Sequence, residues 1–390
     1  MNPIKSIILF FGKDMLRHVL TFSIIAIISW FLKENGIFWA GYVHWISLIL
    51  VSTIIIWRAG DFFSIAANYI QEKHNLPQSI KAAVIDAIAS SFPEFCVAVI
   101  AVLMIGKAEV GIASVVGSAL YNVLVIPAAA GLVAATPMVI SREVVWRDNI
   151  FYLGVTILLF SMLWIFPNEW GAGVACLFLL AYIGYIFILQ RDFKKSSKLE
   201  KESLAAEAHK VETIKSEPEL LNPSNEELNE IELSSEKMAW AWIIGLMIVM
   251  GGASHFLVEA SLELGEMLQV PGVIMGFVVI AAGTSVPDTA LSVISAKKGQ
   301  YDAAISNVFG SNIFDICICL SIPILLALAI SGETTKINLP QMELIWSLVG
   351  ATFLAIYFFW SNNYTLTKLK AGMMGMLYLL IVLISFNIPT

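Results

Sequence analysis

Charged residues are scarce in this chain. Asp, Glu, Lys and Arg make up 14% of its 390 residues, whereas a soluble globular domain carries about 25%. Hydrophobic residues account for 58%, and the mean hydropathy is +0.81. This composition predicts a polytopic membrane protein, whose surroundings are the lipid bilayer. A net charge of −7 argues against a nucleic-acid partner.

Cysteine is also sparse, and its spacing excludes the usual cysteine frameworks. The four cysteines all lie in apolar runs, and no two form a Cys-x-x-Cys pair. We interpret them as small core residues and expect neither a disulfide framework nor a zinc site. The four cysteines are Cys96, Cys176, Cys317 and Cys319. The sequence indicates no resident cofactor.

The first apolar run lacks the small-residue cleavage site of a signal peptide. It extends from His18 to Leu32 and is followed by Lys33-Glu34-Asn35. We therefore predict that residues 1–37 hold an additional, uncleaved N-terminal hydrophobic helix. A run of this length is marginal for crossing about 30 Å of hydrocarbon.

Ten further apolar segments follow, in two groups of five. Between the groups, residues 191–237 are rich in Glu, Lys, Ser and Asn and have no apolar periodicity, which predicts a polar linker of disordered or partly helical character. The two five-span units are residues 38–190 and 238–390. The predicted spans lie near 38–70, 79–106, 109–135, 149–166, 170–190, 239–262, 272–296, 303–331, 344–361 and 371–388.

The number of spans and the basic residues predict the arrangement in the membrane. Because five is odd, the second unit enters the bilayer from the face opposite to the first, as in an inverted repeat. With the linker cytoplasmic, most Lys and Arg residues fall on the inner side. We therefore predict an all-α, ten-span inverted-repeat (5+5) transporter fold in the cell membrane (inner or plasma membrane). Nothing in the sequence demands an oligomer, so a monomer suffices.

The two units share a motif. Pro77 and Pro93 are sixteen residues apart, as are Pro271 and Pro287, and each second proline is followed at once by a carboxylate, Glu94 or Asp288. An ionisable side chain inside an apolar span is expensive to keep, so a matched pair indicates an ion site at the repeat interface. Proline should also break each helix and free carbonyl oxygens of the preceding turn.

The oxygen donors near these carboxylates suit a hard cation. Ca²⁺ takes six to eight oxygens from carboxylates, carbonyls and similar groups. A second polar cluster follows each carboxylate, after 23 residues in the first unit and 22 in the second, and begins with Gly117 or Gly310, which would permit close helix approach. Singly, several of these hydroxyls could equally hydrogen-bond neighbouring helices. The candidate donors are Ser90, Ser91, Thr284, Ser285, Ser118, Asn122, Ser311 and Asp315.

These motifs resemble a known family. The second copy, from Ala281-Ala282-Gly283-Thr284-Ser285-Val286-Pro287-Asp288 to Gly310-Ser311-Asn312-Ile313-Phe314-Asp315, resembles the second alpha repeat of sodium/calcium exchangers. The first copy, with Ser91-Phe92-Pro93-Glu94 and Gly117-Ser118-Ala119-Leu120-Tyr121-Asn122, is similar to their first alpha repeat. Asp288, Asp315 and Ala119 look most like the potassium-dependent branch.

The resemblance implies an antiporter that exchanges Na⁺ against Ca²⁺, with or without K⁺, by alternating access. It implies that Glu94 and Asp288 are central calcium ligands, helped by backbone oxygens at Ser90 and Thr284. It further implies a K⁺-related role for Asp315. The residues that it assigns to sodium are Ser91, Ser285, Ser118, Ser311, Asn122 and Asp315.

Arg58 departs from this pattern. It lies at mid-depth of the first span, near Asp61, with Asp86 one helix later. One interpretation is an internally neutralised pair of Arg58 with Asp61 or Asp86. The other is that Arg58 tunes the charge of the cation site, which would suit a proton-driven calcium or cation exchanger on the same fold.

Two other classes agree less well with the sequence. An intramembrane aspartyl protease would need a Gly-x-Gly-Asp partner for Asp302, and none exists. A passive channel would conduct without a counter-ion. We therefore predict a transporter and no enzyme activity.

Overall fold

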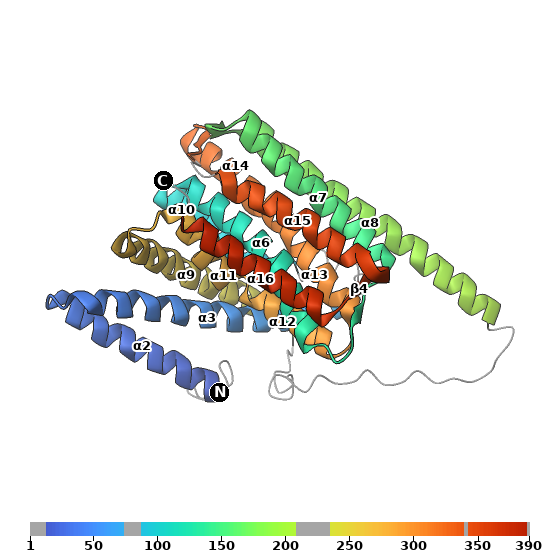
Figure 1. Cartoon of the computed structure of the whole chain (residues 1–390), viewed down its shortest axis with the longest axis horizontal. Coiled ribbons are helices and arrows are strands. Elements are labelled where there is room, and N and C mark those ends of the chain that lie inside the picture. Colours follow the sequence, from blue (N-terminus) through green and yellow to red (C-terminus); the bar gives the residue numbers. More distant parts are fainter. Residues whose placement is uncertain (1–12, 74–86, 208–234, 339–341, 388–390) are drawn as a thin grey trace.

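The computed structural model describes residues 13–73, 87–207, 235–338 and 342–387, and these are almost entirely helical (Figure 1). Asp86 and most of the predicted linker, residues 208–234, lie outside the described residues. The elements of the first unit are α2 (Lys13–Glu34), α3 (Phe38–Lys73), α5 (Ala87–Val99), η2 (Ile100–Ile105), α6 (Ala108–Val133), β1 (Met138–Val139), α7 (Arg142–Ile165), β2 (Glu169–Trp170) and α8 (Ala172–Glu207). The elements of the second unit are α9 (Glu236–Leu268), α10 (Gly272–Met275), η4 (Gly276–Ile280), α11 (Ala281–Thr284), α12 (Val286–Lys297), α13 (Tyr301–Phe314), η5 (Asp315–Cys319), α14 (Leu320–Ser331), β3 (Thr335–Lys336), α15 (Met342–Tyr364), β4 (Thr365–Leu366) and α16 (Lys368–Ser385).

Most of these helices are long and apolar enough to cross a membrane. Nine qualify in the described part of the chain by length and composition, and ten if the bent pair 272–284 and 286–297 counts as one span. A shorter apolar helix, Ala89–Ile105, completes the set of eleven segments expected from the sequence. The helix α8 continues to Glu207, so the first part of the predicted linker is helical (Figure 1).

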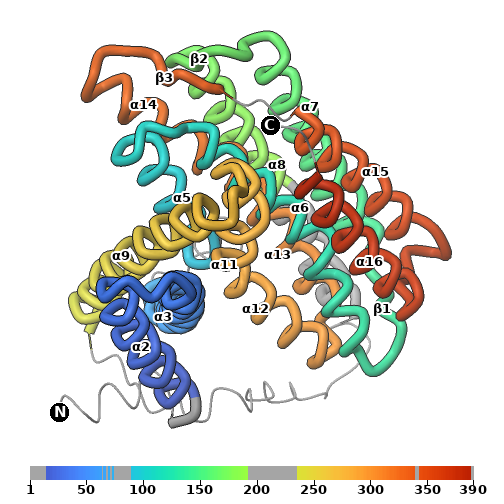
Figure 2. Tube along the Cα trace, turned by 60° about the vertical axis from the view of Figure 1, so that its left-hand side comes forward, coloured from blue at the N-terminus to red at the C-terminus, as the bar shows by residue number. Residues whose placement is uncertain are grey.

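The additional N-terminal helix α2 folds back on α3. A short turn at Asn35 to Ile37 joins them, and Gly36 there has a positive φ of 83°, which glycine adopts without strain. His44 Nδ1 lies 2.8 Å from the Ala26 carbonyl, and the Lys33 ammonium lies 4.4 Å from the centre of the Trp45 ring. The helix α3 in turn packs along α9, and Figure 2 shows these three helices together at one side of the bundle.

Two short strand pairs join the units reciprocally. The strand β1 precedes α7 and pairs with β4, which follows α15, in the register Met138 to Leu366. The strand β2 follows α7 and pairs with β3, which precedes α15, in the register Trp170 to Thr335. Both pairs are antiparallel. The helices α7 and α15 therefore run in opposite directions and are tied to each other at both ends.

Helix packing follows the same reciprocal rule. The helix α6 of the first unit packs against α16, the last helix of the second, while α14 packs against α8, the last helix of the first. This exchange of partners is what a pseudo-two-fold axis between inverted units produces. The largest apolar core involves α6, α7, α8 and α13 to α15, and α11 to α13 lie in the middle of the bundle (Figure 2).

Candidate functional site

The second Pro-carboxylate motif lies at a broken helix. The helix α11 ends at Thr284, and α12 begins at Val286 after a bend of 46°. Ser285 at the break has φ −81° and ψ 2°, which is not helical, and Pro287 lies in the first turn of α12, where its missing N–H needs no partner. Asp288 follows in the same turn, beside the positive end of the helix dipole.

The first motif differs, and the expected break at Pro93 is wrong. Pro93 lies inside the continuous helix α5, and the chain then widens into the π-helical segment η2, which ends at Ile105, just before Gly106. A π-type adjustment and packing against neighbouring helices let a buried helix keep a proline. Since proline has no N–H, the Ala89 carbonyl still lacks its intrahelical donor. Glu94, one residue further, is 1% exposed.

The predicted residues come together from four segments of both units: α5, α6, the α11–α12 break and α13 with its continuation η5. Ser118 on α6 is the central contact: its Oγ lies 2.8 Å from Ser285 Oγ, 3.3 Å from Glu94 Oε1 and 3.5 Å from Asp315 Oδ2. Ser285 Oγ also lies 3.4 Å from Glu94 Oε1. A hydroxyl of the first unit thus links a carboxylate of its own unit to a carboxylate of the other.

Asp288 has its own set of donors from both units. Its Oδ1 accepts from Ser311 Oγ at 2.9 Å and from Asn307 Nδ2 at 3.3 Å, and its Oδ2 accepts from Asn122 Nδ2 at 3.5 Å. Asn122 Nδ2 also lies 3.0 Å from Asn312 Oδ1. We call the assembly the cross-repeat cluster. Its members are Ser90, Ser91, Glu94, Ser118, Asn122, Ser285, Asp288, Ser311, Asn312 and Asp315.

Several oxygens of the cluster have no hydrogen-bond partner. Glu94 Oε2, Ser91 Oγ and Asn122 Oδ1 are buried and unpartnered. Within the described residues no salt bridge joins a Lys or Arg to Glu94, Asp288 or Asp315. Nor does that part of the chain hold a group of three or more His, Cys, Asp or Glu side chains placed for a metal ion. Buried carboxylate and amide oxygens without partners are groups that a bound cation would satisfy.

Close backbone packing holds α6 against the second unit. A Cβ added at Gly117 would collide with the Phe277 carbonyl oxygen on η4, so only glycine fits there. This confirms the close approach expected at Gly117. A Cβ at Gly310 would only reach van der Waals contact, 3.9 Å from the Tyr185 hydroxyl, and the expectation of close approach there is wrong.

Two other predicted groups have partners of different kinds, one within its own helix and one in the other unit. Thr284 Oγ1 lies 3.2 Å from both the Ile280 and the Ala281 carbonyls, so its hydroxyl donates within its own helix. Ser90 Oγ lies 3.3 Å from Ser311 Oγ and so links α5 to α13.

Arg58 forms an ion pair on its own helix. Its Nη1 lies 3.2 Å from Asp61 Oδ2, and its guanidinium lies 4.9 Å from the centre of the Phe62 ring. The two charged side chains are 11% and 23% exposed. This is the Arg58–Asp61 pair of the first interpretation above; Asp86 lies outside the described residues.

Sequence reasoning missed three contributors on α13 and the following segment η5. Asn307 and Asn312 hydrogen-bond within the cluster, and the Cys319 thiol lies 3.7 Å from Asp315 Oδ1. The spacing of Asn307, Ser311 and Asp315 is four residues each time, which places them on one helix face and could have identified Asn307.

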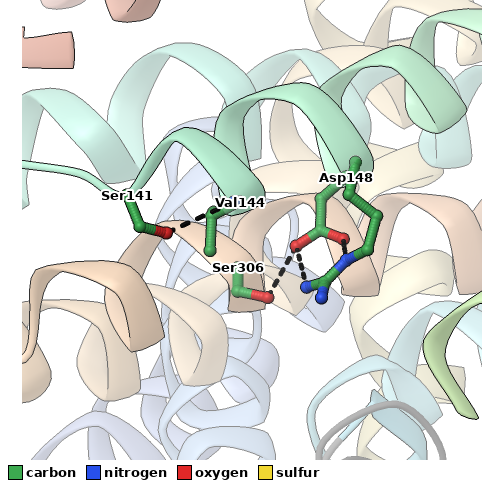
Figure 3. Close-up of polar contacts among 5 residues, drawn as sticks. Ser141, Val144, Asp148 and Ser306 are labelled. Atoms are coloured by element: carbon green, nitrogen blue, oxygen red, sulfur yellow. Dashed lines mark hydrogen bonds and ion pairs between the residues drawn. The ribbon is translucent and has the colours of Figure 1, made fainter. Parts of the chain in front are cut away.

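The residue before Asn307 makes a second polar contact, outside the cluster. This residue, Ser306, donates to Asp148 Oδ2 on α7 at 2.9 Å, as Figure 3 shows. Asp148 is fully buried and is held by Arg147, whose Nε and Nη2 lie 2.7 and 3.0 Å from its two oxygens. Asp302, by contrast, accepts from the Ser141 backbone N–H at 2.6 Å, next to the start of α7. That contact is structural and gives no support for a protease.

Comparison with known proteins identifies the family. The family model described as "Sodium/calcium exchanger protein" matches residues 44–190 and 238–387 of this chain. The chain belongs to this family. It is therefore a cation/calcium exchanger of an ion-transporting family and not an enzyme.

Relatives and solved structures agree with this membership. The chain is 25% identical to human sodium/potassium/calcium exchanger 5 over 418 residues, covering 88% of this chain and 82% of that protein. It is 26% identical to the inner membrane protein YrbG of Escherichia coli K12, covering 79% and 86%. The structure is similar to that of the H⁺/Ca²⁺ exchanger CAX, with a TM-score of 0.67, 14% identity and coverage of 97% and 90%. It also resembles the sodium-calcium exchanger NCX_Mj, with a TM-score of 0.55, 18% identity and coverage of 88% and 98%. The predicted all-α, inverted-repeat membrane fold is thereby confirmed.

Proposed function

We propose that this protein is a secondary-active antiporter that exchanges Na⁺ against Ca²⁺ by alternating access to the cross-repeat cluster. One observation carries the proposal. Glu94 and Asp288, at matched positions of two inverted units, lie in one buried cluster whose hydroxyl and amide groups come from both units. A site on the pseudo-two-fold axis can be reached from either membrane face by equivalent movements.

In this proposal Glu94 and Asp288 are the calcium ligands, with backbone oxygens at Ser90 and Thr284. Glu94 Oε2 is already free of protein partners. Two carboxylates balance the charge of one Ca²⁺, and hydroxyl, amide and carbonyl oxygens complete its coordination. Sodium ions would use the remaining oxygens when calcium leaves. Those residues are Ser91, Ser285, Ser118, Ser311, Asn122 and Asp315.

We further propose that Asp315 contributes to any K⁺ dependence. The similarity to a relative named a sodium/potassium/calcium exchanger supports this. The units 38–190 and 238–390 would be joined by a cytoplasmic linker, residues 191–237. The protein would lie in the cell membrane, and the name of the related inner membrane protein supports this location. A single copy of the chain contains the complete cluster, which supports a working monomer.

The test is radioactive calcium uptake into sodium-loaded proteoliposomes, with external potassium present or absent. We expect uptake that requires internal sodium, and Glu94→Gln should abolish it. Glu143→Gln is the matched control, because Glu143 is an exposed carboxylate on α7. Sodium-driven uptake that survives in Glu94→Gln would refute the ligand assignment.

A second candidate is a proton-driven calcium or cation exchanger. Arg58 on α3 motivates it, because a positive charge in a span could replace a transported cation, although the ion pair with Asp61 leaves the two residues together neutral. Uptake driven by a pH gradient in the absence of sodium would favour this candidate over the first.

A further inference from the structure

Two consecutive residues of α13 hydrogen-bond to different helices. Ser306 donates to Asp148 on α7 at 2.9 Å, as Figure 3 shows, whereas Asn307 donates to Asp288 on α12 at 3.3 Å. Asp148 lies outside the cross-repeat cluster, and Asp288 lies within it. Asp148 is therefore linked to a proposed calcium ligand through the backbone between two neighbouring residues.

The equivalent position in the other repeat is apolar. The helices α7 and α15 begin with matched segments, Glu143-Val144-Val145-Trp146-Arg147-Asp148 and Glu343-Leu344-Ile345-Trp346-Ser347-Leu348, so Leu348 stands in the place of Asp148. Ala113 stands in the place of Ser306, because each lies four residues before the glycine of its second polar cluster. Leu348 and Ala113 both belong to the largest apolar core, and α15 packs against α6. Apolar packing is therefore sufficient to join these helices at this position.

Asp148 is more costly to bury than the leucine at its equivalent position. A buried carboxylate is unfavourable unless it is paired, and Arg147 pairs it through two N–H groups at 2.7 and 3.0 Å. Because well-packed apolar residues are often as stable as a buried ion pair, stability alone does not account for Asp148. The two hydrogen bonds from Arg147 fix the direction of the carboxylate. Asp148 thus offers Ser306 an acceptor at one defined position.

The orientation of α13 about its axis matters for the cluster. Asn307, Ser311 and Asp315 lie four residues apart on one face of the helix and its continuation. Asn307 and Ser311 both donate to Asp288 Oδ1, at 3.3 and 2.9 Å. Their side-chain atoms lie about 5–6 Å from the helix axis, so a rotation of about 10° would move them by about 1 Å. A binding site needs its groups held within about 0.5 Å.

We propose that Asp148 is a positioning residue for cation binding. Through Ser306 it fixes the orientation of α13 at which Asn307 donates to Asp288. The inference rests on the proposed role of Asp288 as a calcium ligand. It also makes the two repeats unequal, because the packing of α6 on α15 is apolar at the equivalent position.

The test transfers the apolar junction of one repeat to the other. We call Arg147→Ser/Asp148→Leu/Ser306→Ala the apolar-junction variant. It removes the buried charge together with both of its partners, so the purified protein should fold and melt close to the wild type. Its calcium affinity, measured by equilibrium binding of radioactive calcium, should nevertheless fall by about tenfold. The residues that it reproduces are Ser347, Leu348 and Ala113.

Two sets of single variants serve as controls. Ser347→Ala is matched to the change at Arg147, because Ser347 stands at the equivalent position and its hydroxyl donates to the Leu344 carbonyl of its own helix. It should leave calcium affinity unchanged. Ser306→Thr keeps the hydroxyl and should bind calcium as the wild type does, whereas Ser306→Ala should bind it more weakly. If the apolar-junction variant does not fold, the comparison of these two Ser306 variants decides.

Asn307→Ala tests whether Asp148 acts through α13. In the wild type this substitution removes a donor to Asp288 and should lower calcium affinity by about tenfold. In the apolar-junction variant it should have little further effect, because residues that act in one chain of contacts are not additive. Equal effects of Asn307→Ala in both backgrounds would overturn the positioning role.

The outcomes separate this inference from the proposed function. Weakened calcium binding by the apolar-junction variant, in a protein whose wild type shows no sodium-driven uptake, would support the positioning role and refute sodium coupling. Sodium-driven uptake by the wild type, with unchanged calcium affinity in the variant, would do the reverse. A variant that melts well below the wild type but binds calcium equally well would show that Asp148 serves stability alone.

Discussion

The hydroxyl of Ser118 on α6 lies 2.8 Å from the hydroxyl of Ser285 at the α11–α12 break, and the two residues belong to opposite repeats. Both hydroxyls also lie within 3.4 Å of the same carboxylate oxygen, Glu94 Oε1. The two hydroxyls supply two hydrogens for these three contacts, so the three hydrogen bonds cannot all form at once. A cation that displaces these hydrogen bonds would change contacts in both halves of the molecule at once.

Ser118→Ala should weaken calcium binding. The substitution removes the hydroxyl that contacts Glu94 and Asp315. A hydrogen bond to a charged group contributes about 1.5–3 kcal/mol, so we expect the calcium KM to rise by about tenfold. The measurement is calcium uptake at varied external calcium.

Ser114→Ala is the control for that experiment. Ser114 lies one turn earlier on α6 and is equally buried, but its Oγ has no hydrogen-bond partner. Its removal should leave the calcium KM within experimental error. Equal effects of the two substitutions would mean that Ser118 only fills space.

Gly117→Ala should destabilise the fold. The added methyl group would collide with the Phe277 carbonyl oxygen, and backbone cannot move aside as a side chain can. Overpacking of this kind typically costs about 1–3 kcal/mol, and thermal unfolding of the purified protein should register it. Gly154→Ala on α7 is the control, since a Cβ there meets nothing within 4 Å. A similar melting temperature for both variants would contradict the close contact.

Ser306→Ala should loosen α13 from α7. It removes the hydrogen bond to the buried Asp148 carboxylate, and we expect a loss of about 1.5–3 kcal/mol in the free energy of unfolding. Ser161→Ala removes a hydroxyl that donates only to the Ile157 carbonyl within its own helix α7, and should change stability little. Denaturant unfolding compares the two. No difference between them would show that the Arg147–Asp148 pair holds its place without Ser306.

Arg58→Gly should alter the charge moved per calcium ion if Arg58 tunes the site. The substitution removes a positive charge from a span and leaves Asp61 without its ion-pair partner. Current and calcium flux measured together in proteoliposomes give the ratio. The double variant Arg58→Gly/Asp61→Asn restores neutrality, so it distinguishes lost pairing from lost tuning. An unchanged ratio in Arg58→Gly would end the tuning hypothesis.

The sequence was sufficient to predict the architecture, because the apolar segments mark the helices and the proline spacing marks the repeat. The apolar segments correspond to observed helices, and the paired carboxylates Glu94 and Asp288 lie in one cluster. Local propensity did not predict the continuity of α5 through Pro93, since that depends on packing and on the π-helical turn that follows. Cys319 was missed for a similar reason: a cysteine in an apolar run looks like core until a carboxylate is found beside it.

The reciprocal strand pairs have a consequence for how the chain is assembled. Each five-span unit contributes two strands, and both partners of those strands belong to the other unit. Neither unit alone can complete its own turns before and after α7 or α15. The two halves should therefore mature only as a complementary pair, with the first-synthesised half waiting in the bilayer for the second.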